Sequence, residues 1–151
     1  MKDYAPVKRE VLNCTHWLVE HGFLGQMTSG GNISARVPNE KAVAITPSGR
    51  PYLTLNENDI CVIDFDRNPI QSNSAPSIEA AMHIGVYQNR ADVNAVVHTH
   101  QPFASTLSII NKPIPALFDE ITVEIGHAVE VIPYAFSGSP DLVNNVISRL
   151  N

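Results

Sequence analysis

The stretch "VNAVVHTHQPF", residues 93–103, places two histidines one residue apart at the end of an apolar run. Alternate side chains of a β-strand point to the same face, so His98 and His100 are expected to lie side by side. Two neutral imidazoles arranged in this way can bind one divalent metal ion such as zinc. Taken alone, the pattern fits two hydrogen-bonded core histidines equally well. A catalytic zinc site also needs a third protein ligand and an open position.

Glu79 is the leading acidic candidate to accompany these histidines. The run "PSIEAAMHIGVYQNR", residues 76–90, predicts a helix with Glu79 in its first turn. A carboxylate there is stabilised by the helix dipole, so simple capping is the alternative to acid–base chemistry. His83 follows four residues later on the same side, and we expect it to support the site or the core rather than to bind metal. The predicted inner stripe of this helix is Ile78, Ala81, Met82, Gly85, Val86 and Asn89.

Two small-residue segments are candidates for binding an anion. "TSGGNIS", residues 28–34, is predicted to be a loop in which Gly30 and Gly31 let the backbone approach a ligand. "TPSG", residues 46–49, offers a second set of donors. Simple turns are the alternative, and neither segment matches a P-loop or a dinucleotide fingerprint. The candidate donors are Asn32, Ser48, Gly49 and Ser77.

The elements that must position these residues form an α/β pattern. Residues 6–22 predict a helix with Val7, Val11, Cys14 and Leu18 on one face. Strands are predicted at "AVAIT", "DICVIDF", "VNAVVHTH" and "VEVIPY", and a last helix at "SPDLVNNVISRLN" with Ser139 as its N-cap. Because several strands follow one another directly, an antiparallel or mixed sheet covered by helices is favoured over a doubly wound parallel sheet.

The composition narrows the class of protein. A chain of 151 residues with 44% apolar residues can form one domain with a real core, and we place no domain boundary within 1–151. The net charge of −5 argues against a general nucleic-acid binder. The chain has no run of about 18 uncharged apolar residues, so no membrane span is expected. The two cysteines predict buried thiols in a reducing cytosol, and hence a cytoplasmic protein.

The last predicted helix carries an apolar stripe, and the sequence stops one residue after it. No later element is available for that stripe to pack against. We therefore expect this sequence to be a domain that lacks its C-terminal part.

Taken together, these segments resemble one family. "SGGNISAR", "ITPSG", "PSIEAAMHIGVYQNRADVNAVVHTHQPFASTLS" and "IPAL" occur in the order and spacing of the class II aldolase/adducin family, which includes aldolases and 4-epimerases of sugar phosphates. The resemblance implies an α/β/α sandwich around a mostly antiparallel sheet. It also implies a homotetramer with active sites between neighbouring subunits.

The resemblance also implies a role for each candidate residue. His98 and His100 match two of the three zinc-binding histidines, and Glu79 matches the acid–base glutamate. The third zinc histidine of the family belongs to a His-Gly motif beyond the helix that ends this sequence. His127 follows Gly126 in the reverse order and comes too early to replace it. The positions that match phosphate donors are Asn32, Ser48, Gly49 and Ser77.

Two positions depart from the aldolase pattern. Where the aldolases place a tyrosine shortly after "IPA", supplied across the subunit interface as a proton donor, this sequence has Asp119. An acidic residue there is more similar to the epimerase branch. Ile78 replaces a second serine expected before the glutamate, which removes one phosphate donor.

The resemblance predicts a zinc-dependent aldolase that cleaves a C–C bond of a small ketose phosphate through a metal-stabilised enediolate. Glu79 would move the proton at the nucleophilic carbon, with Asp119 as the second catalytic candidate. A sugar-phosphate 4-epimerase using the same cleavage is the near alternative. A non-catalytic, adducin-like interaction domain is the alternative of another class.

Overall fold

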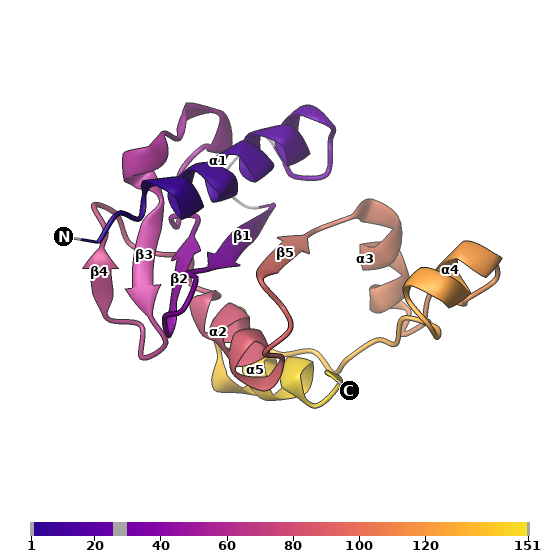
Figure 1. Cartoon of the computed structure of the whole chain (residues 1–151). Helices are drawn as coiled ribbons and strands as arrows, with labels where there is room; N and C mark the ends of the chain where they lie inside the picture. Colours follow the sequence, from indigo (N-terminus) through magenta and orange to yellow (C-terminus); the bar gives the residue numbers. More distant parts are fainter. Residues whose placement is uncertain (1, 26–29, 151) are drawn as a thin grey trace.

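The computed structural model describes residues 2–25 and 30–150, so Thr28 and Ser29 of the predicted anion loop lie outside the described residues. The elements follow the order of a helix, a group of strands, and then helices around one further strand (Figure 1). They are α1 Ala5–Glu20, β1 Gly31–Arg36, β2 Ala42–Ile45, η1 Tyr52–Thr54, η2 Glu57–Asp59, β3 Cys61–Asp64, β4 Pro69–Gln71, α2 Ala80–Asn89, β5 Ala95–Thr99, α3 Pro102–Ile109, α4 Asp119–Glu124 and α5 Pro140–Ile147.

The strands form one sheet with the order β4-β3-β2-β1-β5. Each of the four neighbouring pairs is antiparallel, which confirms the expected sheet type. Strand β5 is the last in sequence but pairs with β1, the first, so the two ends of the strand series meet at one edge. Asn32 and His98 lie on this edge, and Glu79 stands at the N-cap of the helix α2.

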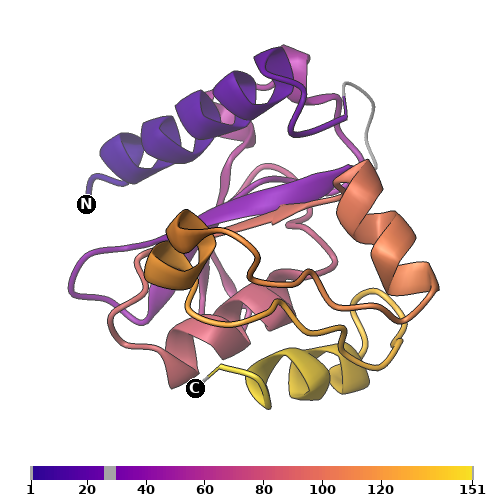
Figure 2. The ribbon, with the colours of Figure 1, turned by 90° about the vertical axis from the view of Figure 1, so that its right-hand side faces the viewer.

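Helices cover both faces of the sheet (Figures 1 and 2). Strand β2 is buried along its whole length, because its alternate side chains enter two different cores. Ala42 and Ala44 pack with Val7 and Val11 of α1, while Ile45 packs with residues of α2. Helix α5 lies against the outer side of α2. The result is the expected α/β/α sandwich.

The helix predictions are largely confirmed at α1 and α5. Val7 and Val11 are buried, with Cys14 and Leu18 packed at the margin of the same core. Ser139 Oγ accepts a hydrogen bond from the Leu142 N–H at the start of α5, as expected for an N-cap.

Four local predictions are wrong. Strand β1 begins at Gly31, so half of the predicted loop is strand. The segment "VEVIPY" forms no strand in the described chain beyond an isolated bridge of Val129 to Ile114. Helix α2 starts after Glu79, which therefore stands at the N-cap rather than in the first turn. Ile78 is 64% exposed and Asn89 is also exposed, so neither belongs to the inner stripe of α2, whose core residues are Ala80, Ile84 and Tyr87.

Residues 102–136, here called the outer segment, leave the sandwich beyond β5 and carry α3 and α4 (Figure 1). Every residue of these two helices is exposed or half-buried. No helix among the described residues is long and apolar enough to cross a membrane.

Candidate active site

The pairing of β1 with β5 brings the first two candidate residues together. Asn32 and His98 are direct partners across the two strands. Gly31, one position earlier, has φ +122°, and a Cβ on it would lie 2.0 Å from the His98 carbonyl oxygen. The glycine is therefore needed for close contact between the strands, whereas the sequence had suggested contact with a ligand.

Glu79 is held where these two strands meet the start of α2. Its Oε2 accepts hydrogen bonds from Asn32 Nδ2 and from His98 Nδ1, both at 2.7 Å. Its Oε1 accepts a third hydrogen bond from Ser137 Oγ, also at 2.7 Å. The hydrogen bond from His98, followed by those from Asn32 and Ser137, lowers the pKa of Glu79 to about 2 against the opposing effect of burial. Because the side chain makes no capping hydrogen bond, helix capping does not account for this residue.

His98 and His100 lie side by side as predicted, with ring centroids 4.8 Å apart. Because His98 uses Nδ1 to bond Glu79, its Nε2 is left for another partner. A carboxylate on one imidazole nitrogen with a metal on the other is a common arrangement in metal sites. The donor set therefore suits zinc or a similar divalent ion, although the described residues hold no cluster of three acidic, histidine or cysteine ligands.

A pocket of about 260 Å³ opens beside Glu79. It gathers six of the eight candidate residues, and His98 lies next to it through its bond to Glu79. Its described lining includes the Glu79 carboxylate but no lysine or arginine. The lining residues are Gly31, Asn32, Pro47, Ser48, Gly49, Tyr52, Ser77, Ile78, Glu79, His100 and Ser137.

Two loops form the wall of this pocket that could hold an anion. The Ser77 N–H donates to the Thr46 carbonyl at 3.1 Å, and the Ser48 N–H donates to the Ala75 carbonyl at 2.9 Å. These hydrogen bonds hold the two loop segments that carry Ser48 and Ser77 next to each other. The Glu79 N–H donates to Ser77 Oγ at 3.2 Å, so the hydroxyl hydrogen of Ser77 remains available to a ligand.

Asp119 is not brought into the pocket. It begins α4 in the outer segment, is exposed, and is absent from the pocket lining. Conversely, the sequence interpretation missed Ser137 and Tyr52. Ser137 had been explained as part of the turn before α5, and its contact with Glu79 has no local sequence signature. Tyr52 lines the pocket and its hydroxyl donates to the Gly31 carbonyl.

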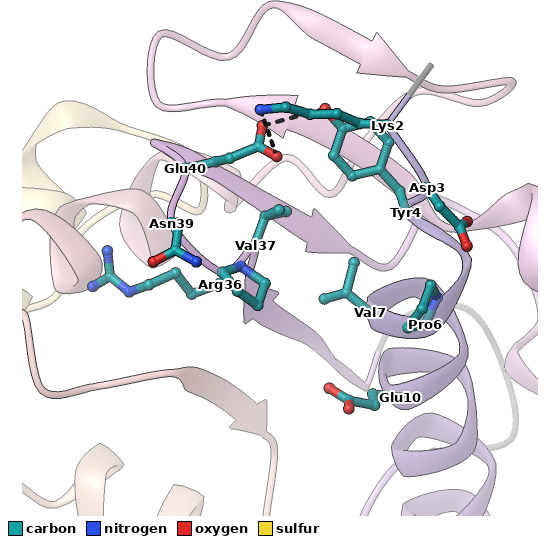
Figure 3. Close-up of a pocket in the computed structure, with 11 residues that line it drawn as sticks. Lys2, Asp3, Tyr4, Pro6, Val7, Glu10, Arg36, Val37, Asn39 and Glu40 are labelled. Carbon is teal, nitrogen blue, oxygen red and sulfur yellow. Dashed lines mark hydrogen bonds and ion pairs between the residues drawn. The ribbon is translucent and has the colours of Figure 1, made fainter.

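A larger cavity, about 490 Å³, lies between the start of α1 and the β1–β2 turn (Figure 3). Its Glu40 carboxylate is paired with Lys2 Nζ at 3.0 Å and accepts a hydrogen bond from the Tyr4 hydroxyl at 3.2 Å. The cavity contains none of the candidate residues. Size alone therefore does not identify the site.

Comparison with known proteins decides the family. The sequence signature described as "Class II Aldolase and Adducin N-terminal domain" matches residues 9–151. The chain belongs to the class II aldolase and adducin family. This result confirms the resemblance inferred from the His-x-His and glutamate spacing.

Several curated aldolases are similar to this class II aldolase and adducin domain. An L-fuculose phosphate aldolase of Escherichia coli O6:H1 is 37% identical over 122 residues, which are 81% of this chain and 55% of that protein. A 5-deoxy-D-ribulose 1-phosphate aldolase of Bacillus thuringiensis is 34% identical over 116 residues, or 77% and 54% of the two chains. The matched part is thus about half the length of these relatives.

Solved structures agree with the fold. An L-fuculose 1-phosphate aldolase superposes with a TM-score of 0.89 and 34% identity, covering 98% of this chain and 68% of that one. L-fuculose-1-phosphate aldolase from Thermus thermophilus gives a TM-score of 0.75 at 22% identity, covering 98% and 72%. The second likeness supports the fold only.

Proposed function

We propose that the full-length protein is a metal-dependent class II aldolase that cleaves a C–C bond of a small ketose phosphate. The observation that carries the proposal is the position of Glu79. One oxygen of its carboxylate faces His98, a candidate metal ligand, and the same pocket contains the serine and amide donors of the anion wall. The names of the similar aldolases support the same class of substrate.

His98 and His100 would hold zinc or another divalent metal, with a third ligand from outside the described residues. When bound, the metal would supply Lewis-acid stabilisation of negative charge on the substrate oxygens. The pocket itself offers little positive charge, since its described lining has a carboxylate and no lysine or arginine.

The substrate phosphate would be bound by neutral donors. These are the hydroxyls of Ser48 and Ser77, the Gly49 amide and the second Nδ2 hydrogen of Asn32. Backbone and hydroxyl groups of this kind bind anions without a countercharge.

Glu79 would move the proton at the nucleophilic carbon. In retro-aldol cleavage of a ketose 1-phosphate, the C4 hydroxyl would give its proton to a second acid–base group, for which Asp119 from a neighbouring subunit is the candidate, and the C3–C4 bond breaks. The bonding pair stays on C3, which then takes up a proton. The products are dihydroxyacetone phosphate and an aldehyde. The ionised Glu79 carboxylate is suited to remove that C3 proton in the aldol direction. In the cleavage direction, Glu79 would first take up a proton and would then deliver it to C3.

We also propose a cytoplasmic homotetramer in which Asp119 reaches the active site of a neighbouring subunit. Support comes from the apolar side chains that the outer segment exposes and from the position of Asp119 outside the pocket of its own chain. The described cysteines, Cys14 and Cys61, are free thiols, which fits a reducing compartment.

The test is metal content and product analysis of the full-length protein with L-fuculose 1-phosphate and 5-deoxy-D-ribulose 1-phosphate as substrates. We expect one divalent metal per subunit, loss of turnover on chelation, and dihydroxyacetone phosphate as product. Residues 1–151 alone should bind zinc weakly, because two histidines leave the ion largely solvated. Tight binding by this piece would contradict the ligand assignment.

Two other functions give different results in the same experiment. A 4-epimerase, which Asp119 keeps under consideration, would convert a sugar phosphate to its epimer without net cleavage. An adducin-like interaction domain would neither load metal nor turn over any substrate.

A further inference from the structure

His83 is a fully buried residue of α2 whose two ring nitrogens both form hydrogen bonds. Nε2 lies 2.5 Å from Asn32 Oδ1, and Nδ1 lies 2.7 Å from Ser34 Oγ. The ring does not line the pocket, so it cannot touch a substrate there. Its contacts nevertheless lead to the pocket, because Asn32 also bonds the Glu79 carboxylate.

These contacts are possible because the spacing of two residues on β1 matches the spacing of two residues at the start of α2. Asn32 and Ser34 are two residues apart on β1, so they face α2 together at a spacing of about 6.7 Å. Glu79 and His83 are four residues apart at the start of α2, which corresponds to a rise of about 6 Å. The two pairs therefore meet in register across the interface between strand and helix.

The direction of each hydrogen bond can be assigned from Glu79 inward. A carboxylate only accepts, so the Asn32 amide must turn Nδ2 toward Glu79 and Oδ1 toward His83. His83 Nε2 must then carry a hydrogen. Burial lowers the pKa of His83 to about 4, which keeps the ring neutral, so Nδ1 accepts from the Ser34 hydroxyl. The Tyr87 hydroxyl ends this series of hydrogen bonds, since it lies 2.8 Å from Ser34 Oγ and 3.0 Å from the Ser34 carbonyl oxygen.

We propose that His83 is a positioning residue that locks the Asn32 amide with its Nδ2 toward Glu79 and the substrate pocket. A flipped amide would place Oδ1 against the carboxylate, and the Nε2–H of His83 holds Oδ1 away from that position. The kinetic consequence of this inference rests on the proposed aldolase function, whereas the orientation of the amide does not.

The test uses a matched pair of variants in the full-length protein. His83→Gln can still reach Asn32 with an amide N–H, whereas the shorter side chain of His83→Asn cannot. We expect His83→Asn to lower kcat by about 10- to 100-fold with little change in KM, and His83→Gln to restore most of it. A purely structural role would lower the melting temperature of both variants and leave kcat of the folded enzyme unchanged, which would overturn the proposal.

NMR provides a readout that needs no substrate and no variant. In the wild-type protein, ¹⁵N shifts of histidine should show His83 as the neutral Nε2–H tautomer, and an Nδ1–H tautomer would overturn the assignment. The side-chain amide protons of Asn32 should exchange with water at least tenfold faster in His83→Asn than in wild type or His83→Gln; equal rates in all three would also overturn it. An inactive wild-type protein with these NMR signatures would refute the proposed function and leave the positioning role supported.

Discussion

The sandwich and the outer segment differ in the direction in which their apolar side chains point. In the sandwich, alternate residues of β2 and β3 enter cores under α1 and α2 and are almost completely buried. In the outer segment, side chains of similar size face outward, although burial of each would contribute about 1.5–3 kcal/mol. They are Phe103, Ile109, Ile110, Leu117, Phe118, Val123, Ile125, Val129, Tyr134 and Phe136.

The difference shows which part of the site this chain can build by itself. Glu79, Asn32 and His98 are fixed by the sandwich, through strand pairing and contacts with α2. Asp119 belongs to the outer segment, whose two helices have no buried residue. The proposed neighbouring subunit would cover its apolar side chains and bring Asp119 to a pocket.

The largest expected effect is on kcat, and it comes from comparing Glu79→Gln in the sandwich with Asp119→Asn in the outer segment. Glu79→Gln should lower kcat by about 10²–10⁴-fold while metal content is preserved, because the amide cannot exchange the proton. Asp119→Asn should lower kcat by about tenfold, and only in the assembled protein. Kinetics with metal analysis, and sedimentation to check assembly, measure both.

Either of two results would contradict the roles proposed for these residues. Unchanged turnover of Glu79→Gln would remove Glu79 from the mechanism. Unchanged turnover of Asp119→Asn in the assembled protein would remove the outer segment from the chemistry.

The second effect compares two glycines with positive φ. Gly31→Ala should destabilise the fold by more than about 3 kcal/mol, because its Cβ would overlap the His98 carbonyl. Gly126→Ala in the outer segment should cost only about 1–2 kcal/mol of backbone strain, because nothing lies within 4 Å of the added atom. Urea unfolding measures both. Equal losses would mean that the outer segment is as tightly packed as the sheet.

The smallest effect concerns two serines where the outer segment rejoins the sandwich. Ser137→Ala removes one donor to Glu79, which should lower the free energy of unfolding by about 1 kcal/mol and should also lower kcat several-fold. Ser139→Ala removes the N-cap of α5 and should lower the free energy of unfolding by about 1 kcal/mol without changing kcat. An unchanged kcat in Ser137→Ala would show that Ser137 serves the fold rather than the site.

Local sequence patterns predicted the sandwich better than the outer segment, for a physical reason. "AVAIT" and "DICVIDF" are strands because partners on both sides bury them. "VEVIPY" has the same apolar character, but in the described chain it has no neighbouring strand to pair along its length, and strand formation depends on such pairing.

The candidate site was predictable where its residues lie within one strand or helix, because their separation in the sequence then determines how the side chains are arranged. His98 and His100 follow from strand alternation, and Glu79 was placed within one residue of its position at the start of α2. The contact of His83 with Asn32 depends on the register between a strand and a helix 51 residues apart, which no local pattern encodes. Ser137 was missed for the same reason.

The three hydrogen bonds to Glu79 join segments that are 19, 47 and 58 residues away along the chain. Forming contacts between such distant segments requires closing long loops, which costs chain entropy. Such contacts therefore tend to form late and slowly. During refolding, the helices should therefore appear before the carboxylate is clamped. Recovery of any activity that depends on Glu79 would then report completion of the whole sandwich, and would lag behind recovery of helical circular dichroism.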